Sequence, residues 1–269
     1  MRTGLRPLKK FSQNFLKDET YARRLVDSMK VQPEDVILEI GAGEGMLTRC
    51  LMQTEAARII AVELDSRMLP WLEMRFGSDA RFRLIANDFL KVDLPALVES
   101  EASGKKIRVV GNLPYAITSP ILFSLLENRQ LVQDVTVTVQ KEVAERFVSS
   151  PGKKAYGIPS VLFQLYGDLA LLFYIPRQAF EPVPKVESAV LQCRFLNASR
   201  FPIADVDVLR QLVKTGFGQR RKMLRNTISS LLGSPDGSVP IDLTLRPEQV
   251  SIQSWAELAN FCVQKTGEG

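Results

Sequence analysis

The sequence predicts an α/β protein in which a mostly parallel sheet is followed by a small all-helical domain. Short runs rich in β-branched residues alternate with helical patterns over the first two thirds of the 269 residues, and only helical patterns follow. Strands and helices that alternate at this interval form βαβ units, whose sheet carries helices on both faces. We therefore expect an α/β domain over residues 1–199, beginning with a basic arm at 1–17, and a helical domain over 200–269.

Five apolar runs, each bounded by polar or turn residues, predict the parallel strands. They occupy residues 35–40, 58–64, 81–86, 106–111 and 134–139. A helical pattern precedes each of these runs, at residues 20–30, 46–55, 66–76, 95–102 and 120–130. Two later runs, 169–175 and 188–196, have no helical pattern between them, so we expect an antiparallel pair that closes one edge of the sheet. The helical domain should contain helices at 208–217, 222–232 and 253–265.

The composition excludes several kinds of catalytic site. There is no His, which excludes Ser–His nucleophile pairs and His-ligated zinc. The three Cys are far apart and outside any CxxC spacing, which indicates a reducing compartment, no disulfide framework and no thiolate metal site. No run has the length of a membrane span, and the N-terminus lacks the apolar region of a secretion signal. We expect a cytoplasmic monomer without metal or membrane attachment.

Basic residues are grouped along the chain, and the formal net charge is +5. One group contains Arg220, Arg221, Lys222 and Arg225 without an intervening acid, a second contains Lys153 and Lys154, and a third lies in the N-terminal arm. Clusters of this kind favour a surface that binds nucleic acid. The alternative is the solvated surface of a mildly basic enzyme.

A glycine-rich turn follows the first strand, and polar residues follow the next three. Gly41, Gly43 and Gly45 allow a tight turn and a close approach of the backbone to a ligand, as in dinucleotide-binding proteins. Glu63, Asp88 and Asn112 come next, at intervals of 22 to 25 residues counted from Gly41. Each interval is one βα unit, so these residues should meet at the carboxyl ends of neighbouring strands, where open sheets bind ligands.

The chemistry of these residues favours S-adenosylmethionine over NAD. Glu63 can accept both hydroxyls of a ribose, and Asp88 can accept a hydrogen bond from the amine of an adenine. The glycine turn holds Glu44 and no Lys or Arg, which disfavours a pyrophosphate. Each acid alone would also suit a helix N-cap, and only their matched spacing favours the shared ligand.

The segment "NLPY", Asn112 to Tyr115, has the groups that methyl transfer to an aromatic amine requires. The Asn112 side chain and the Leu113 carbonyl can accept the two N–H bonds of the amine, while Pro114 fixes the direction of that carbonyl. Tyr115 offers a face on which a base can stack. Positioning of the amine is most of the catalysis, and no general base is needed.

Motifs along nearly the whole chain resemble the KsgA-type small-subunit (16S) ribosomal RNA adenine N6,N6-dimethyltransferases. They include "FSQNFLKDE", "EIGAGEGMLT", "GNLPYAITSPILF", "AFEPVPKVESAV" and "GFGQRRKMLRN". The resemblance implies a Rossmann-like class I methyltransferase sheet, a cofactor site closed by Asn14 and Leu16, a second stacking residue at Phe180 opposite Tyr115, and an rRNA-binding helical domain. It also implies that two methyl groups are added to each of two adjacent adenosines near the 3′ end of small-subunit rRNA, in immature small subunits.

Two alternatives remain open on the sequence. A large-subunit rRNA adenine methyltransferase of the macrolide-resistance type shares the cofactor site, although "QRRKMLRN" and the "RPEQ" segment resemble the small-subunit enzymes more. A non-catalytic rRNA-binding assembly factor would have no use for Glu63, Asp88 and Asn112. Two positions depart from the family pattern: Ser12 stands where Gly is usual, and Ala116 where a polar residue often follows "NLPY".

Overall fold

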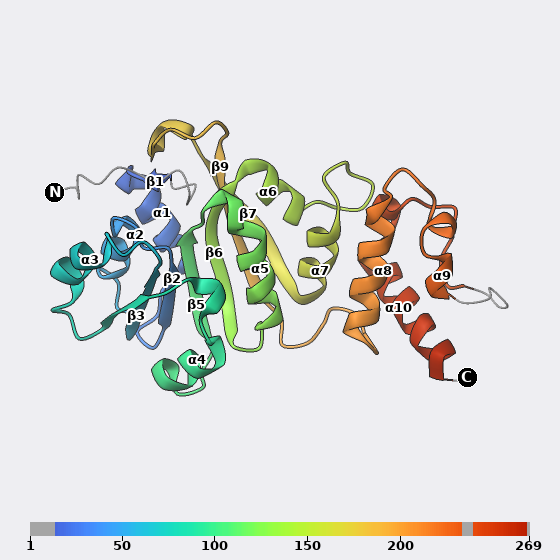
Figure 1. The fold of residues 1–269 in the computed structure, drawn as a ribbon, viewed down its shortest axis with the longest axis horizontal. Coiled ribbons are helices and arrows are strands. Elements are labelled where there is room, and N and C mark those ends of the chain that lie inside the picture. Colours follow the sequence, from blue (N-terminus) through green and yellow to red (C-terminus); the bar gives the residue numbers. More distant parts are fainter. Residues whose placement is uncertain (1–13, 233–238, 268–269) are drawn as a thin grey trace. The chain divides into compact units, whose positions relative to one another are not determined.

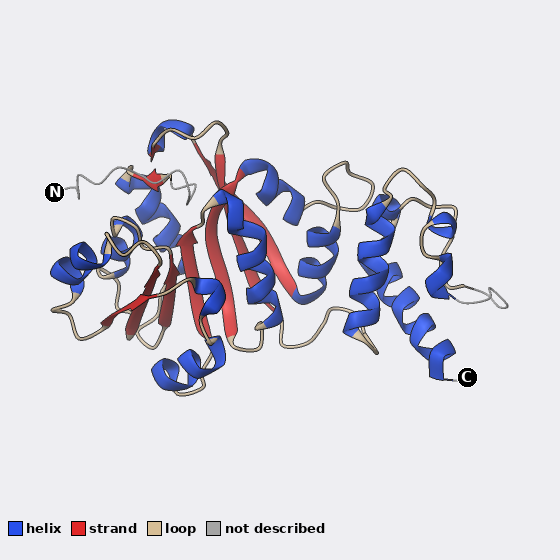
Figure 2. Cartoon of the chain, viewed as in Figure 1, coloured by secondary structure: helices blue, strands red, loops and turns tan. Residues whose placement is uncertain are grey.

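The computed structural model describes residues 14–232 and 239–267, and it has the α/β class expected from the sequence (Figures 1 and 2). The chain forms two compact units. The first contains residues up to 144 together with 170–195, and the second contains 145–169 together with the residues from 196 onward. Residues 145–169 thus pack with the helical unit, although they precede residue 200 in the sequence. The proposed domain limits at 199 and 200 stay a prediction.

One seven-stranded sheet organises the first unit, in the order β4-β3-β2-β5-β6-β9-β7. The four pairings among β4, β3, β2, β5 and β6 are parallel, and β9 pairs antiparallel with β6. The strand bounds are β2 (Val36–Ile40), β3 (Arg58–Glu63), β4 (Phe82–Ala86), β5 (Ile107–Asn112), β6 (Val132–Gln140), β7 (Gly167–Ile175) and β9 (Ser188–Phe195). All five parallel strands predicted from the sequence are therefore confirmed, and the two later runs lie side by side at one edge.

Helices alternate with the parallel strands and follow the sequence pattern. Asp18 caps the first by accepting a hydrogen bond from Thr20 N–H, and its buried residues recur at helical spacing from Ala22 to Met29. The strands β2 and β3 are buried along nearly their whole length, as expected where both faces of a parallel sheet are covered. The helix bounds are α1 (Glu19–Met29), α2 (Met46–Leu51), α3 (Leu69–Phe76), α4 (Leu94–Ala102) and α5 (Thr118–Glu127).

A single apolar cluster joins one face of the sheet to α1, α2 and α3. It contains Leu25, Leu51 and Leu72 from the helices and Ile37 and Ile59 from the strands, all fully buried. Burial of a side chain of this size contributes about 1.5–3 kcal/mol, so the cluster holds the glycine turn between β2 and α2 in a fixed place.

A short pair of strands was not anticipated from the sequence. The segment β1 (Phe15–Leu16) pairs antiparallel with β8 (Phe180–Glu181), which follows the 3-10 turn η4 (Arg177–Ala179). Lys17 N–H extends this pairing by donating to Ala179 O at 2.8 Å. Strands of two residues carry no periodic pattern, and the pairing joins segments far apart in the sequence.

The second unit is mainly helical. Its helices pack around the fully buried Trp255, whose ring lies 6.0 Å from that of Phe217. Gly216 permits this packing, because a Cβ at that position would lie 2.7 Å from the Trp255 ring. The helices are α6 (Lys141–Phe147), which begins in the first unit, then α7 (Ile158–Tyr166), α8 (Val206–Gly218), α9 (Ser229–Leu232) and α10 (Ile252–Gly267).

The helix expected at residues 222–232 is wrong in its first half. Residues Leu224–Asn226 form a 3-10 turn, η5, and only Ser229–Leu232 form a helix. The reason is a competing set of hydrogen bonds: Leu224 N–H donates to Leu245 O at 2.9 Å, and Arg225 N–H donates to Leu243 O at 3.0 Å. These long-range bonds hold residues 224 and 225 against residues 243 and 245, and Met223 before them is extended (φ −68°, ψ 152°), which interrupts the helix.

Candidate active site

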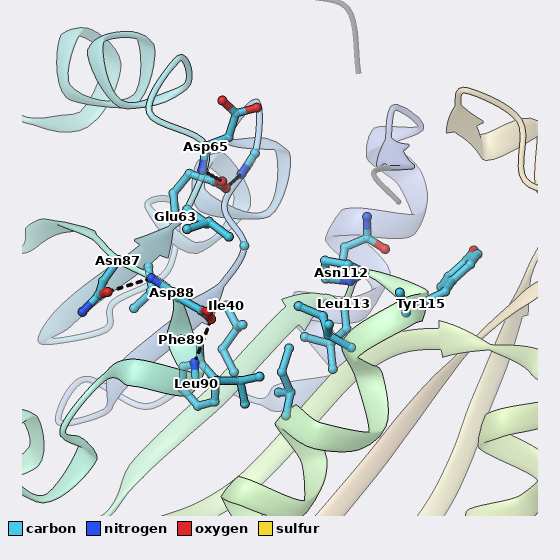
Figure 3. Close-up of a pocket in the computed structure, with 18 of the residues that line it drawn as sticks. Ile40, Glu63, Asp65, Asn87, Asp88, Phe89, Leu90, Asn112, Leu113 and Tyr115 are labelled. Atoms are coloured by element: carbon cyan, nitrogen blue, oxygen red, sulfur yellow. Dashed lines mark hydrogen bonds between the residues drawn. The ribbon is translucent and has the colours of Figure 1, made fainter. Parts of the chain in front are cut away.

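A cavity of about 220 Å³ lies at the carboxyl ends of β2, β3, β4 and β5 (Figure 3). Open α/β sheets bind ligands at this edge. The structure brings nine of the residues singled out in the sequence to its wall: Asn14, Gly41, Gly43, Glu63, Asp88, Asn112, Leu113, Pro114 and Tyr115. Figure 3 shows Glu63 and Asp88 on one side of the cavity, with Asn112 and Tyr115 across from them.

Glu63, the last residue of β3, is held by the backbone on two sides. Gly43 N–H donates to its Oε2 at 2.7 Å, and Asp65 N–H donates to its Oε1 at 2.7 Å. The residue is only 5% exposed, and this burial raises the pKa of its carboxyl, while the two N–H donors act in the opposite direction. Each oxygen keeps a further lone pair that a ligand hydroxyl can use.

Gly43 has a second role besides its bond to Glu63. Its φ of +54° is in the left-handed region, and a Cβ at this position would lie 2.9 Å from the ring of Phe15. Phe15 also lines the cavity. Phe15 was not predicted from the sequence, although it stands between Asn14 and Leu16 in the "QNFL" segment.

Asp88 follows β4 and combines two roles that the sequence presented as alternatives. Its Oδ1 accepts a hydrogen bond from Leu90 N–H at 3.0 Å, which caps the 3-10 turn η2 (Phe89–Lys91). Its side chain also lines the cavity, between the apolar residues Ile40, Phe89 and Leu90 (Figure 3). A carboxylate has two oxygens, so the cap leaves the second oxygen for a ligand.

The amide of Asn112 is oriented by the segment before β1. Its Nδ2 donates to the backbone carbonyl of Asn14 at 2.8 Å. Because only the NH₂ end of an amide can donate, this bond leaves Oδ1 as the end that can accept. Leu113 N–H donates to Thr138 O at 3.1 Å, which fixes the backbone of the next residue against β6.

Pro114 and Tyr115 complete the turn after β5. The Pro114 carbonyl accepts hydrogen bonds from Ile117 N–H and Thr118 Oγ1, both at 3.1 Å. Tyr115 begins the 3-10 turn η3 (Tyr115–Ile117), and its ring is partly buried. Its hydroxyl lies 2.6 Å from Ser188 Oγ, and burial raises the pKa of the phenol, so the group stays protonated near neutral pH.

Leu16 and Phe180 lie beside the cavity rather than on its wall. Both are buried in the apolar cluster that contains α1, and Phe180 is 0% exposed. The sequence predicts that Phe180 stacks on a base opposite Tyr115. In the structure its ring packs in the core where β8 pairs with β1, so no face of the ring is open to a base. Its stacking role stays a prediction that requires a shift of β8.

A buried acid, Glu39, lies under the glycine turn. It is 1% exposed, and Thr48 Oγ1 donates a hydrogen bond of 2.6 Å to its Oε2. Burial raises the pKa of this carboxyl from 4.5 to about 7. Glu39 was not predicted from the sequence, because an acid in the middle of an apolar strand gives no hint of its partner nine residues later.

Six basic side chains of the second unit are exposed and form what we call the basic surface: Lys153, Lys154, Arg220, Arg221, Lys222 and Arg225. The structure joins two groups that are separate in the sequence. The Nη2 atom of Arg220 donates to Lys154 O at 3.0 Å and to Tyr156 O at 2.9 Å. The N-terminal basic residues and Ser12 lie outside the described residues.

Other features bear on the class of site. Within residues 14–232 and 239–267, no group of three or more acids or cysteines is placed to hold a metal ion. The three cysteines are buried, and none of them forms a disulfide. None of the helices in the part of the chain that the structure describes has the length and apolar character that a membrane span needs.

Comparisons with known proteins agree with this geometry. The family described as "Ribosomal RNA adenine dimethylase" matches residues 5–263. "Ribosomal RNA small subunit methyltransferase A" of Pseudomonas aeruginosa is 39% identical over 263 residues, which cover 97% of each chain. The protein of the same name in Geobacter metallireducens is 41% identical over 227 residues, which cover 84% of this chain and 82% of that one.

Two solved structures share the fold. A dimethyladenosine transferase from Plasmodium falciparum superposes with a TM-score of 0.79 at 22% identity, covering 94% of this chain and 98% of that chain. The 23S rRNA methyltransferase ErmE gives a TM-score of 0.70 at 23% identity, covering 93% and 100%. These two likenesses confirm the expected Rossmann-like methyltransferase fold. With the family match over nearly its whole length, the chain belongs to the ribosomal RNA adenine dimethylase family.

Proposed function

We propose that this protein transfers methyl groups from S-adenosylmethionine to the exocyclic amines of two adjacent adenosines near the 3′ end of small-subunit rRNA, during maturation of the subunit. The observation that carries the proposal is the orientation of Asn112: its Nδ2 is bonded to Asn14 O, so its Oδ1 remains as an acceptor beside the cavity. The substrate follows from the family and from the names of the relatives. We propose further that the protein acts in the cytoplasm as a monomer, without a metal ion.

The residues of the cavity fit the proposed cofactor. Its lining contains the carboxylates Glu63, Asp65 and Asp88, of which Asp65 is paired with Arg67, and none of the described lining residues is Lys or Arg. An acidic wall suits a cationic adenosine ligand and disfavours a dinucleotide, whose pyrophosphate is anionic. Glu63 would hold the ribose hydroxyls and Asp88 the adenine amine, with Gly41 and Gly43 leaving room along the backbone. Asn14 and Leu16 would close the site from the side of β1.

S-adenosylmethionine, when bound, supplies a methyl group that is already activated on a sulfonium. The protein has to hold the acceptor amine. Asn112 Oδ1 and the Leu113 carbonyl would accept its two N–H bonds, which favours a pyramidal nitrogen whose lone pair points toward the methyl group to be transferred. Tyr115 would stack on the base, an interaction that contributes about 1–3 kcal/mol in single-stranded recognition. Methyl transfer leaves a positively charged nitrogen that is acidic enough to release a proton to water, so no basic side chain is required.

The basic surface would bind the phosphates of the rRNA. All six of its exposed cations are residues predicted from the sequence to bind RNA, and Arg220 connects the two groups through backbone carbonyls. An enzyme of large-subunit rRNA remains the second candidate, and mapping the methylated nucleotide separates the two. A non-catalytic assembly factor is the third, and the intact set of Glu63, Asp88 and Asn112 in one cavity argues against it.

The test is methylation of immature small subunits, measured by mass spectrometry of the rRNA. We expect dimethyladenosine with the wild-type protein and at least about a hundredfold slower formation with Asn112→Ala, because one acceptor for the amine is lost. Asn128→Ala is the matched control: Asn128 also donates its amide to a backbone carbonyl, Ser124 O at 2.9 Å, but at the end of α5 away from the cavity. Unmodified adenosines after prolonged incubation with the wild-type protein would contradict the proposal.

A further inference from the structure

The hydroxyl of Tyr115 has a partner that the proposed mechanism does not use. It lies 2.6 Å from Ser188 Oγ, and Ser188 is 0% exposed. Ser188 is the first residue of β9 and is paired in register with Gln140 of β6. Its hydroxyl is therefore held by the backbone of the sheet, and it offers Tyr115 a fixed point 73 residues away in the sequence.

The orientation of the Tyr115 ring depends on such an anchor. Tyr115 is the first residue of a three-residue 3-10 turn, and its ring lines an open cavity instead of packing on all sides. The rotation of an aromatic ring about its Cβ–Cγ bond has a broad energy profile, so a ring without an anchor samples many orientations. A hydrogen bond at the far end of the ring restricts both side-chain torsions together.

We propose that Ser188 is a positioning residue for adenine methylation: its buried hydroxyl holds the Tyr115 ring in the plane on which the target base stacks. The inference rests on the proposed function, in which Tyr115 carries the base. Stacking is favourable only when the two ring planes are nearly parallel, so a freely rotating Tyr115 would hold the base less often in the orientation for transfer. Ser188 acts through Tyr115 and does not itself touch the substrate.

If the hydrogen bond between Tyr115 and Ser188 had only a structural role, its loss would have different effects. It would change the stability of the fold and leave the turnover of folded protein unaltered. The chain offers a matched control for that role on the same pair of strands, because Gln192 Nε2 of β9 donates to the buried Thr136 Oγ1 of β6 at 3.1 Å. Thr136→Val removes a buried hydroxyl between β6 and β9 without touching Tyr115.

The experiment compares Ser188→Ala, Ser188→Thr, Tyr115→Phe, the double variant Ser188→Ala/Tyr115→Phe and Thr136→Val. We measure kcat and KM on immature small subunits, with the fraction of folded protein taken from the stoichiometry of cofactor binding in calorimetry. We expect Ser188→Ala and Tyr115→Phe each to lower kcat about fivefold, as for the loss of one neutral hydrogen bond. KM should change less than about twofold, because phosphate contacts dominate the affinity for rRNA.

Four further results are expected. The double variant should be no slower than either single variant, because both remove the same bond. Ser188→Thr, which keeps the hydroxyl, should recover most of kcat, and Thr136→Val should match the wild type. Cofactor affinity should be the same in all five, since the bond between Tyr115 and Ser188 involves neither Glu63 nor Asp88.

Wild-type turnover in Ser188→Ala, or losses that multiply in the double variant, would overturn the inference while leaving the proposed function intact. A wild-type protein that methylates no rRNA would overturn the proposed function itself, and the inference with it. If Ser188→Ala does not fold, Tyr115→Phe and Ser188→Thr still decide the matter: the first must be slow and the second must be close to wild type.

Discussion

Protonation of Glu39, which lies under the glycine turn, makes the stability of the fold depend on pH. Burial raises the pKa of its carboxyl from 4.5 to about 7; the bond from Thr48 opposes this rise, and the charge of Glu63 adds to it. The folded protein therefore keeps the proton at pH values where the unfolded chain has lost it. Stability from this group is complete below pH 4.5 and is lost as the pH rises to about 7.

We predict that Glu39→Gln removes this pH dependence. The glutamine side chain keeps an acceptor for Thr48 Oγ1 but does not titrate. Between pH 4.5 and pH 7 the free energy of unfolding of the wild type should fall by about 3 kcal/mol relative to the variant, as a shift of this size implies. Urea denaturation at several pH values measures the difference. Parallel curves for the two proteins would show that Glu39 is ionised in the folded state.

Among single residues, those that follow strands could be predicted from the sequence, and those that act through a hydrogen-bond partner could not. Glu63, Asp88 and Asn112 were found because one βα unit separates each from the next, which places them at one edge of a parallel sheet. Ser188 could not be assigned from spacing, because its contact with Tyr115 depends on how β9 pairs with β6. Phe180 was expected at the cavity, and its burial with α1 depends on the unforeseen pairing of β8 with β1.

Between elements, the amino ends of the strands are joined by a buried charge network around Arg108 of β5. The guanidinium is 4% exposed and forms ion pairs with Asp35 before β2, at 2.7 Å, and with Asp134 of β6, at 2.6 Å. Its Nη2 also donates to Met29 O at the end of α1, at 2.6 Å. One side chain thus ties three strands and a helix at the edge of the sheet opposite the cavity.

We predict that Arg108→Met lowers the free energy of unfolding by about 3–5 kcal/mol, because Asp35 and Asp134 would be left buried without a cation. Arg108→Met combined with Asp134→Leu should recover part of the loss, since only one acid then remains unpaired. Arg23→Met is the control, because it breaks the exposed pair with Glu19 and should cost less than about 1 kcal/mol. Urea denaturation of the four proteins provides the measurement, and equal losses for Arg108→Met and Arg23→Met would contradict the prediction.

Elements with a strong periodic pattern were predictable, and elements made by long-range pairing were not. The five parallel strands match within a few residues because each is a buried apolar run between polar turns. The helix expected at 222–232 failed because backbone N–H groups at its start bond to Leu243 and Leu245 instead. The hydrophobic pattern of a sequence does not indicate long-range hydrogen bonds of this kind.

For the molecule as a whole, two kinds of surface are carried by two separate units. The first unit holds a cavity lined by carboxylates, and the second holds the basic surface. A ligand that needs the acidic cavity is small and cationic, whereas the basic surface suits a polyanion. The affinity for rRNA should therefore depend on salt, and the affinity for the cofactor should depend on it far less.

We predict that Arg221→Gln combined with Lys222→Gln weakens the binding of small-subunit rRNA and lowers the slope of log K against log salt by about 1.5, since each phosphate contact contributes about 0.7–0.9. The matched control, Lys30→Gln with Lys105→Gln, removes the same charge from exposed positions that precede β2 and β5, at the amino ends of these strands. Filter binding at several salt concentrations measures the slopes. If both double variants reduce the slope equally, net charge and not the basic surface governs binding; if only the first does, phosphates are contacted where Arg220 joins the two basic groups.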